Sequence, residues 1–168
     1  VILPDNMFSL FVPGFVVMFA FFIVGAMSAE LLQERQQGSL RRLMAAPIPP
    51  WAIIIAKMLA YIGLVLVQVL IIFGVASLFF EMPLGESLPG LLLVSLVLGL
   101  TATAMGIMVA SLARSDKQAD SIGMLLGFVL AALGGCMVIG SPVPLYNQGG
   151  TVQLISRLIP HSHALMAY

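Results

Sequence analysis

Four long apolar stretches, each without a single charged residue, constrain this chain more than any other feature of its sequence. They cover residues 6–29, 58–80, 87–113 and 121–156. A bilayer core of about 30 Å is crossed by roughly 20 helical residues at a rise of about 1.5 Å each. Gly140, Pro142 and Pro144 should end the last helix near residue 139. The sequence therefore predicts an all-α polytopic membrane protein, a single transmembrane domain over residues 1–168 with spans at about 8–31, 52–80, 88–113 and 121–140.

Composition supports a membrane protein and excludes several other classes. Of the 168 residues, 61% are hydrophobic and 8% are charged, with 7 Lys and Arg against 7 Asp and Glu. A soluble domain carries about 25% charged residues. A neutral chain without a basic stripe is not suited to nucleic acid. The one cysteine, Cys136, cannot form a disulfide within the chain and is expected to be a small apolar residue.

The positive charges fall on one side of this predicted topology. Six of the 7 flank the first and third connections between spans, namely Arg35, Arg41, Arg42, Lys57, Arg114 and Lys117. The second connection, residues 81–86, has none, and only Arg157 lies on that side. Lys and Arg beside short loops stay on the cytoplasmic side. We therefore expect a multi-pass protein of a plasma membrane (the bacterial inner membrane), with both ends of this chain on the outer side.

The first cytoplasmic connection, residues 33–51, has a pattern of its own. Gly38 can break the incoming helix, and Pro47 can stop a new one. Ser39 is placed to cap that new helix by accepting hydrogen bonds from the free amides of its first turn. The pattern predicts a helix of about two turns over residues 39–46.

This short helix would be amphipathic. Leu40, Leu43 and Met44 share one face at spacings of i, i+3 and i+4, while Arg41 and Arg42 point elsewhere. Such a helix is too short to span a bilayer. It either lies along the membrane interface or docks on a partner, and the pattern alone leaves both possibilities open.

The connection resembles the cytoplasmic loop of type-2 ATP-binding-cassette (ABC-2 type) transporter permeases. Their pattern has an acidic and a basic residue, then Gly with a hydroxyl residue, Leu, Pro, and a Lys that opens the next span. The matching residues are Glu34, Arg35, Gly38, Leu43, Pro47 and Lys57. Ser39 stands where Thr is usual and keeps the hydroxyl group, and Arg41 stands where an acidic residue is common.

A second similarity lies near the end of the chain. It consists of Gly134-Gly135-Cys136, Pro144-Leu145, Ile155-Ser156, Leu158, Pro160-His161 and Ala164-Leu165. This order is similar to the part of these permeases that dips back into the outer leaflet as short helices before the last span. The resemblance implies an outer re-entrant segment over residues 142–168, with Pro144, Leu158, Pro160 and His161 as its marker residues. His161 and His163 form a His-x-His pair, but without a neighbouring carboxylate we expect no metal site there.

The resemblance implies the transmembrane permease subunit of an ATP-driven exporter, here without its first and last spans, that moves an amphipathic, drug-like or lipid-like substrate. The short helix would be a coupling helix that seats on a separate ATPase subunit. The implied coupling residues are Glu34, Arg35, Gly38, Ser39, Leu40, Arg41, Arg42, Leu43, Met44, Pro47 and Lys57. A second permease subunit, identical or closely related, would complete the pair.

The chain is not expected to be an enzyme. It has no Gly-x-x-x-x-Gly-Lys-Ser/Thr motif, so ATP and Mg²⁺ are expected on the partner subunit. It has no histidine within a span and no acid at mid-membrane from which a catalytic dyad could form. The alternative is a secondary transporter or channel without an ATPase partner. That class uses ionisable residues within spans or paired broken helices, of which Pro13 and Gly14 are the main sign here.

Two acids and several small residues carry further expectations. Glu30 and Glu34 are spaced i, i+4, where like charges repel unless a cation, Arg35 or Lys57, lies between them. Small residues four apart should allow close helix packing without defining a particular dimer face; these are Gly123 with Gly127, Ala102 with Gly106, and Gly106 with Ala110.

The first span also carries a series of aromatic and methionine side chains. These are Phe15, Met18, Phe19, Phe22 and Met27. They are candidates to line a substrate path, and the competing reading places them in the protein core or against lipid.

Overall fold

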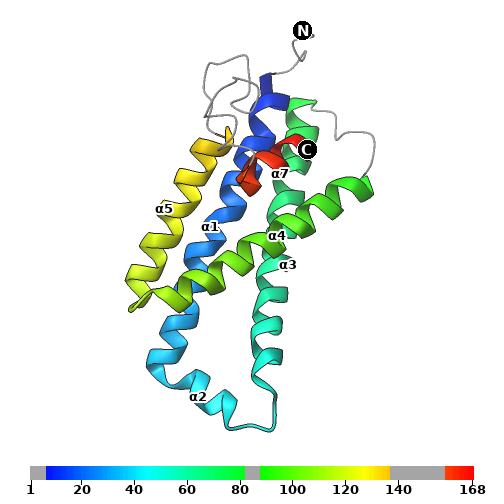
Figure 1. Ribbon diagram of the computed structural model, residues 1–168. Coiled ribbons are helices and arrows are strands. Elements are labelled where there is room, and N and C mark those ends of the chain that lie inside the picture. The colour runs from blue at the N-terminus through cyan, green and yellow to red at the C-terminus, as the bar shows by residue number, and fades with distance from the viewer. Residues whose placement is uncertain (1–6, 82–87, 137–157) are drawn as a thin grey trace.

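A computed structural model describes residues 7–81, 88–136 and 158–168, and every regular element in these ranges is a helix (Figure 1). The elements are α1 (Met7–Gln37), α2 (Ser39–Met44), α3 (Pro50–Phe80), α4 (Leu88–Leu112), α5 (Asp116–Gly134) and α7 (Pro160–Ala167). Within the described ranges, three helices are long and apolar enough to cross a membrane: α1 from Phe11, α3 and α4. The all-α multi-span architecture is confirmed, and the fourth span stays a prediction.

Helix α5 differs from the span we predicted at about 121–140. It starts at Asp116, where the Ser115 hydroxyl accepts a hydrogen bond from the Gln118 amide at 3.2 Å. It ends at Gly134 because Gly135 adopts a left-handed conformation (φ 88°) and its amide turns back to the carbonyls of Ala131 and Ala132. The Gly-Gly pair stops the helix before the prolines that we expected to end it. Residues 137–140 lie outside the described ranges.

Helix α1 is the centre of the bundle. It packs against every other described helix, and Figure 1 shows it between α5 and α3, with α4 running obliquely across it. Its fully buried side chains are Val16, Val17, Ala20, Phe21, Val24, Met27 and Ser28. The first five of these join Val65 and Val69 of α3 and Ala102 and Val109 of α4 in one apolar core. A helix buried on most of its circumference carries apolar residues on all faces, as this one does.

Small residues bring α1 and α5 into close contact, as the sequence pattern predicted. A Cβ atom placed on Gly123 would lie 2.4 Å from the backbone of Gly25, so the two helices could not approach this closely with any larger residue. The Ser28 hydroxyl, one turn away, lies 3.3 Å from the carbonyl oxygen of Ala119 and 2.9 Å from that of Gly25. Gly106 of α4 similarly faces Met27. These small residues therefore serve packing within the chain.

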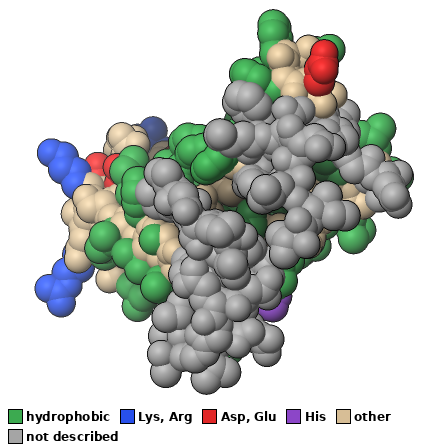
Figure 2. All heavy atoms as spheres, turned by 90° about the horizontal axis from the view of Figure 1, so that it is seen from above, with side chains coloured by type: hydrophobic (Ala, Val, Ile, Leu, Met, Phe, Trp, Pro, Cys, Tyr) green, Lys and Arg blue, Asp and Glu red, His purple; other side chains and the backbone are tan. Residues whose placement is uncertain are grey.

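The outer surface of the bundle is apolar. Large side chains on α3, α4 and α5 are widely exposed, among them Leu78, Phe79, Leu93, Leu112 and Leu125. Figure 2 shows hydrophobic side chains over much of the visible described surface, with Lys and Arg gathered at one edge. A protein with such a surface would be poorly soluble in water and is suited to a lipid environment.

Helix α7 is short and lies among the ends of the longer helices. It packs against α1, α4 and α5, at the end of the bundle where α1 begins and α5 ends (Figure 1). Pro160 occupies its first turn, and His161 and Ser162 are fully buried. Tyr168, after its last turn, lies 2.8 Å from the Ser95 hydroxyl and packs on Phe73. The position agrees with a short helix inserted among spans, while Pro144 and the rest of the predicted re-entrant segment up to residue 157 lie outside the described ranges.

Candidate functional site

The turn between α1 and α2 depends on one glycine. Gly38 has φ 75° and ψ 2°, a left-handed conformation that side chains with a Cβ atom disfavour. A Cβ atom there would meet nothing within 4 Å, so the requirement for glycine comes from the backbone angle and not from crowding. Gly38 accepts a hydrogen bond from the Arg42 amide at 3.1 Å and so begins α2. The predicted helix break at this residue is confirmed.

The predicted capping role of Ser39 is wrong. The cap residue of α2 is Gly38, and no side chain caps this helix. The Ser39 hydroxyl instead donates to the carbonyl oxygen of Glu34 at 3.1 Å, in the last turn of α1. Because Gly38 reverses the chain in a single residue, Ser39 already belongs to the first turn of α2 and its hydroxyl reaches back to the free carbonyls of α1. The bond ties the two helices together.

Helix α2 is slightly shorter than the predicted range of 39–46. It ends at Met44, where the Ala45 amide turns back to the carbonyls of Arg41 and Arg42 at 3.2 Å. Pro47 follows outside the helix. Pro49 then precedes α3, and Pro50 takes its first position, where a missing amide proton costs little.

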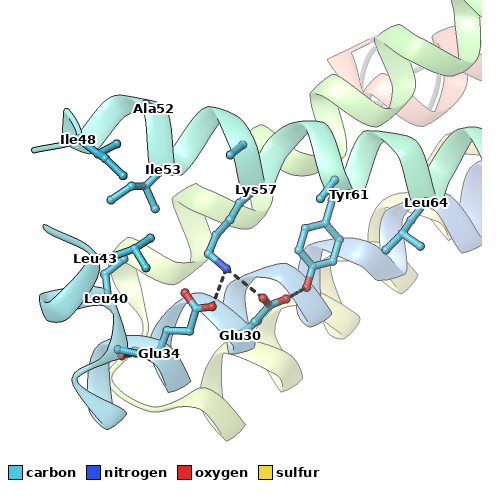
Figure 3. Close-up of a pocket in the computed structure, with 13 residues that line it drawn as sticks. Glu30, Glu34, Leu40, Leu43, Ile48, Ala52, Ile53, Lys57, Tyr61 and Leu64 are labelled. Atoms are coloured by element: carbon cyan, nitrogen blue, oxygen red, sulfur yellow. Dashed lines mark hydrogen bonds and ion pairs between the residues drawn. The ribbon is translucent and has the colours of Figure 1, made fainter. Parts of the chain in front are cut away.

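A cluster of three charged groups connects α1 to α3 beside this turn (Figure 3). The Lys57 ammonium lies 2.9 Å from Oε1 of Glu30 and 2.8 Å from Oε1 of Glu34. The Tyr61 hydroxyl donates to the other oxygen of Glu30. Lys57 is thus the cation between the two acids. Arg35, the other candidate, is exposed and forms no ion pair within the described part of the chain.

This cluster is partly shielded from solvent and carries excess negative charge. The Lys57 side chain is 16% exposed, against 43% for Glu30 and 31% for Glu34. One ammonium group faces two carboxylates, which leaves a formal charge of −1. Charged groups held away from bulk solvent interact more strongly than those on an open surface.

A cavity of about 560 Å³ opens beside the cluster, between α2 and the first half of α3. Its lining residues are Glu30, Glu34, Ser39, Leu40, Leu43, Ile48, Ala52, Ile53, Ala56, Lys57, Ala60, Tyr61 and Leu64. Figure 3 shows the charged groups on one side of it and the large aliphatic side chains Leu40, Leu43, Ile48 and Ile53 toward α2. We call this the ion-pair cavity.

A second cavity of about 300 Å³ lies between α1, α2, α3 and α4. Arg35 is the charged residue in its lining, which otherwise consists of Ser111 and apolar residues that include Leu40 and Met44. Leu40 and Ile53 line both cavities and separate them.

The predicted coupling residues are therefore divided between the linings of the two cavities and the exposed surface. Glu34, Ser39, Leu43 and Lys57 line the ion-pair cavity, Arg35 and Met44 line the second cavity, and Leu40 lines both. Arg41, Arg42 and Pro47 are exposed and line neither cavity. Leu43 and Met44 are 47% and 49% exposed. The apolar face of α2 thus turns partly toward the chain's own helices.

Two residues of the cluster were not among the predicted site residues. The sequence pattern indicates Glu30 only as an acid that shares a cation with Glu34, and it does not indicate Tyr61. Tyr61 follows Lys57 by four positions on α3, so it lies on the same face one turn further along. That spacing is a signal in the sequence that could have placed it.

The second predicted group of residues is centred on His161. Its ring is fully buried and stacks on Phe21 with ring centroids 3.8 Å apart. Neither ring nitrogen has a hydrogen-bond partner within the described residues. Burial lowers the pKa of His161 to about 4, so the ring is neutral at pH 7. Pro160 starts α7, and Leu158 is 86% exposed.

The described residues contain no group of three or more His, Cys, Asp or Glu side chains placed to hold a metal ion.

Aromatic side chains form a row along α1 that reaches α5. Phe15 stacks with Phe19, Phe19 meets Phe22 edge to face, and Phe22 stacks with Phe128 at centroid distances of 6.1, 5.6 and 5.7 Å. Phe15 and Phe19 are 43% and 42% exposed. By contrast, the other two path candidates, Met18 and Met27, lie in the core. We call Phe15, Phe19, Phe22 and Phe128 the aromatic row.

Comparison with known proteins connects these features to a family. A family model described as "ABC-2 family transporter protein" matches residues 4–168. The probable multidrug ABC transporter permease YbhR of Escherichia coli K12 is 25% identical over 136 residues, which are 81% of this chain and 36% of that protein. The inner membrane transport permease YhhJ of the same strain is 31% identical over 155 residues, 88% of this chain and 38% of that protein.

A eukaryotic protein is also similar. ABC transporter G family member 20 of Dictyostelium discoideum is 24% identical over 163 residues, 96% of this chain and 22% of that protein. The chain thus spans between about a fifth and two fifths of the curated relatives it matches. No solved structure matches.

Proposed function

The chain belongs to the ABC-2 transporter family, and from this premise we propose that it forms the core of the permease of an ATP-driven exporter. Similarity to ABC transporter permeases identifies a membrane subunit of such a system. This favours an ATP-driven transporter over the secondary transporter or channel that the sequence left as an alternative. We further propose that a separate subunit binds ATP and Mg²⁺, and that two permease subunits work as a pair.

The observation that supports this function best is the attachment of α2 to two spans. Gly38 and the hydrogen bond from Ser39 to Glu34 connect α2 to the end of α1. Glu34 in turn binds Lys57 of α3. A force applied to α2 is therefore passed to α1 and α3 together. Rigid elements joined by polar contacts can transmit such a displacement as a rigid-body movement.

We propose that the ATPase subunit binds the exposed surface of α2 that faces away from the two cavities. Arg41 and Arg42 are exposed there, and the half-exposed Leu43 and Met44 lie at its edge. The guanidinium groups suit carboxylates on a partner. Leu40 faces inward, so we assign it to holding α2 on the spans and not to contacting the ATPase.

The orientation proposed from the cations places α2 on the cytoplasmic side. It puts the start of α1 and helix α7 toward the outer side, in a plasma membrane such as the bacterial inner membrane. Lys and Arg retention at the cytoplasmic side supports this orientation.

We propose an amphipathic, drug-like or lipid-like cargo. The spans carry no charged residue at mid-membrane, so they offer little to a bare ion. The half-exposed aromatic row offers stacking surfaces to an apolar molecule. One of the similar proteins is described as a probable multidrug permease, which agrees with such a cargo.

The test is co-purification of an ATPase with the full-length permease from native membranes. We compare the wild type with Leu43→Asp and with the double variant Arg41→Glu/Arg42→Glu. Each should reduce the recovered ATPase at least about tenfold, because loss of an apolar or charged anchor at a protein interface costs about 2 kcal/mol or more. The matched control is Arg114→Glu, a charge reversal on the other predicted inner connection, which should leave recovery unchanged.

Two results would contradict the proposal. If no ATPase accompanies the folded wild type, the ATP-driven assignment fails. If all three variants reduce recovery equally, α2 has no special part in binding the ATPase.

A further inference from the structure

The ion-pair cavity has two different kinds of wall. Its charged side consists of Glu30, Glu34 and Lys57, with Tyr61 bound to Glu30. Its other walls are aliphatic, with Leu43 and Ile48 toward α2 and Leu64 deeper along α3. A molecule that fills this space must have a charged or polar end and an apolar body.

The net charge of the cluster determines whether that molecule is a cation or an anion. Both oxygens of Glu30 are occupied, one by Lys57 and the other by Tyr61. Glu34 binds Lys57 through one oxygen only, and no other side chain in the described ranges binds its second oxygen. The lining therefore has a formal charge of −1 and an acceptor that is not fully used. An ammonium group would neutralise the cavity, whereas an anion would be repelled.

The dimensions and position also fit a small amphipathic molecule. About 560 Å³ is within the range of roughly 300–1,000 Å³ typical of sites for drug-sized ligands. Helix α2 packs on α1 and barely approaches α3, so the space between α2 and α3 is not closed by packing of the two helices. Ala56 and Ala60 have small side chains, so they leave space for a ligand beside α3. The cavity is thus placed at the end of the spans beside α2.

We propose that the ion-pair cavity binds an amphipathic monocation, with its ammonium group on Glu34 and its apolar body against Leu43, Ile48 and Leu64. The site would load cargo on the side of the membrane where α2 lies, and this part of the inference rests on the proposed transport function. The occupant is a solute and not a membrane lipid, because the one ammonium of the lining already binds two carboxylates, and the net negative charge would repel the phosphate that accompanies a lipid amine.

The test measures binding to the full-length permease in phosphatidylcholine nanodiscs without any ATPase. The probes are rhodamine 6G, a fluorescent amphipathic cation, and Nile red, which is similar in character but uncharged. Glu34→Gln should weaken rhodamine 6G binding about tenfold, the effect of losing one charge-assisted contact, and leave Nile red within about twofold. This variant keeps the balanced pair of Lys57 and Glu30, so the fold should persist.

Two further variants complete the test. Ala60→Phe fills the cavity without changing charge and should weaken both probes. Asp116→Asn removes the same charge at the start of α5 and should affect neither. Equal rhodamine 6G affinity in the wild type and Glu34→Gln would overturn the proposal, as would unchanged binding in Ala60→Phe.

A lipid control separates the two sources of an ammonium group. If nanodiscs that contain phosphatidylethanolamine lose rhodamine 6G binding, the occupant is a lipid amine and the assignment to a solute is wrong. Because no ATPase is present, failure here leaves the exporter function untouched, and failure of ATPase co-purification leaves the binding result untouched.

Discussion

Replacement of Lys57 by Met is the most informative perturbation of the α1–α3 connection. It removes the ammonium that lies 2.9 Å from Glu30 and 2.8 Å from Glu34 while keeping a side chain of similar length. Two acids at i, i+4 would then face each other without a cation. Both the stability of the permease and its coupling to ATP hydrolysis should fall.

The expected loss follows from the exposure of the three side chains. A hydrogen bond to a charged group contributes about 1.5–3 kcal/mol when buried, and an exposed ion pair about 0–1 kcal/mol. With Lys57 16% exposed and the acids 43% and 31% exposed, the pairs lie between these limits. We therefore assign about 1 kcal/mol to each pair and about 2 kcal/mol to both. The melting temperature of the full-length permease in nanodiscs should fall by roughly 2–3 °C, because the shift per kcal/mol becomes smaller as the chain becomes longer.

A neutral triple variant distinguishes ion pairing from simple packing. In Glu30→Gln/Lys57→Met/Glu34→Gln no charge is left without a partner, so most of the lost stability should return. ATPase stimulation by an uncharged cargo, whose binding does not depend on the Glu34 carboxylate, should not return, because the polar link between Glu34 and α3 is still absent. If Lys57→Met and the triple variant melt at the same lowered temperature, the reasoning from charge is refuted. If the triple variant restores coupling as well, the link is not needed for transmission.

Three further predictions address packing, topology and pH. Gly123→Ala should lower the free energy of unfolding by about 1–3 kcal/mol, because the new Cβ would meet the α1 backbone at 2.4 Å. Gly74→Ala is the control, since a Cβ atom there would meet nothing within 4 Å. Equal melting temperatures of the two variants would contradict the close packing of α1 and α5. In a cysteine-free background, Gln37→Cys should react with an impermeant thiol reagent only from inside and Glu81→Cys only from outside, and reversed labelling would overturn the orientation. The pKa of His161 is lowered from 6.5 to about 4, so the unfolded chain binds the proton first and stability should fall as pH drops from about 6.5 toward 4. His161→Phe should flatten this part of the melting profile, and an unchanged profile would show that another group is responsible.

Much of the fold could be read from local sequence because the bilayer imposes a simple rule. An uncharged run of about 20 residues is predicted to be a span wherever its neighbours lie, since backbone polar groups in lipid must be satisfied within the helix. The break at Gly38 was also local, because a left-handed residue is best supplied by glycine. The end of α5 was misplaced because two stop signals compete there, and Gly135 acts before Pro142 is reached.

The candidate site was predicted only in part, because its members come from different helices. Residues of the α2 turn are close in sequence and were found together. Sequence spacing could not choose between Arg35 and Lys57 as the cation for the two acids. Arg35 is adjacent to Glu34 in sequence but points to the second cavity, whereas Lys57, more distant in sequence, lies within 2.8 Å of it.

The sequence by itself therefore determined the apolar spans, the short helix after Gly38 and the family, since each depends on residue types at short spacing. The tertiary structure decided which faces of those helices meet. It placed Met27 in the core, turned Leu40 inward, and put the His161 ring on Phe21. The physical reason is that lipid tails are as apolar as the helix surface, so burying one apolar face against protein in place of another changes the free energy little. Small residues and a few polar contacts therefore select the packing.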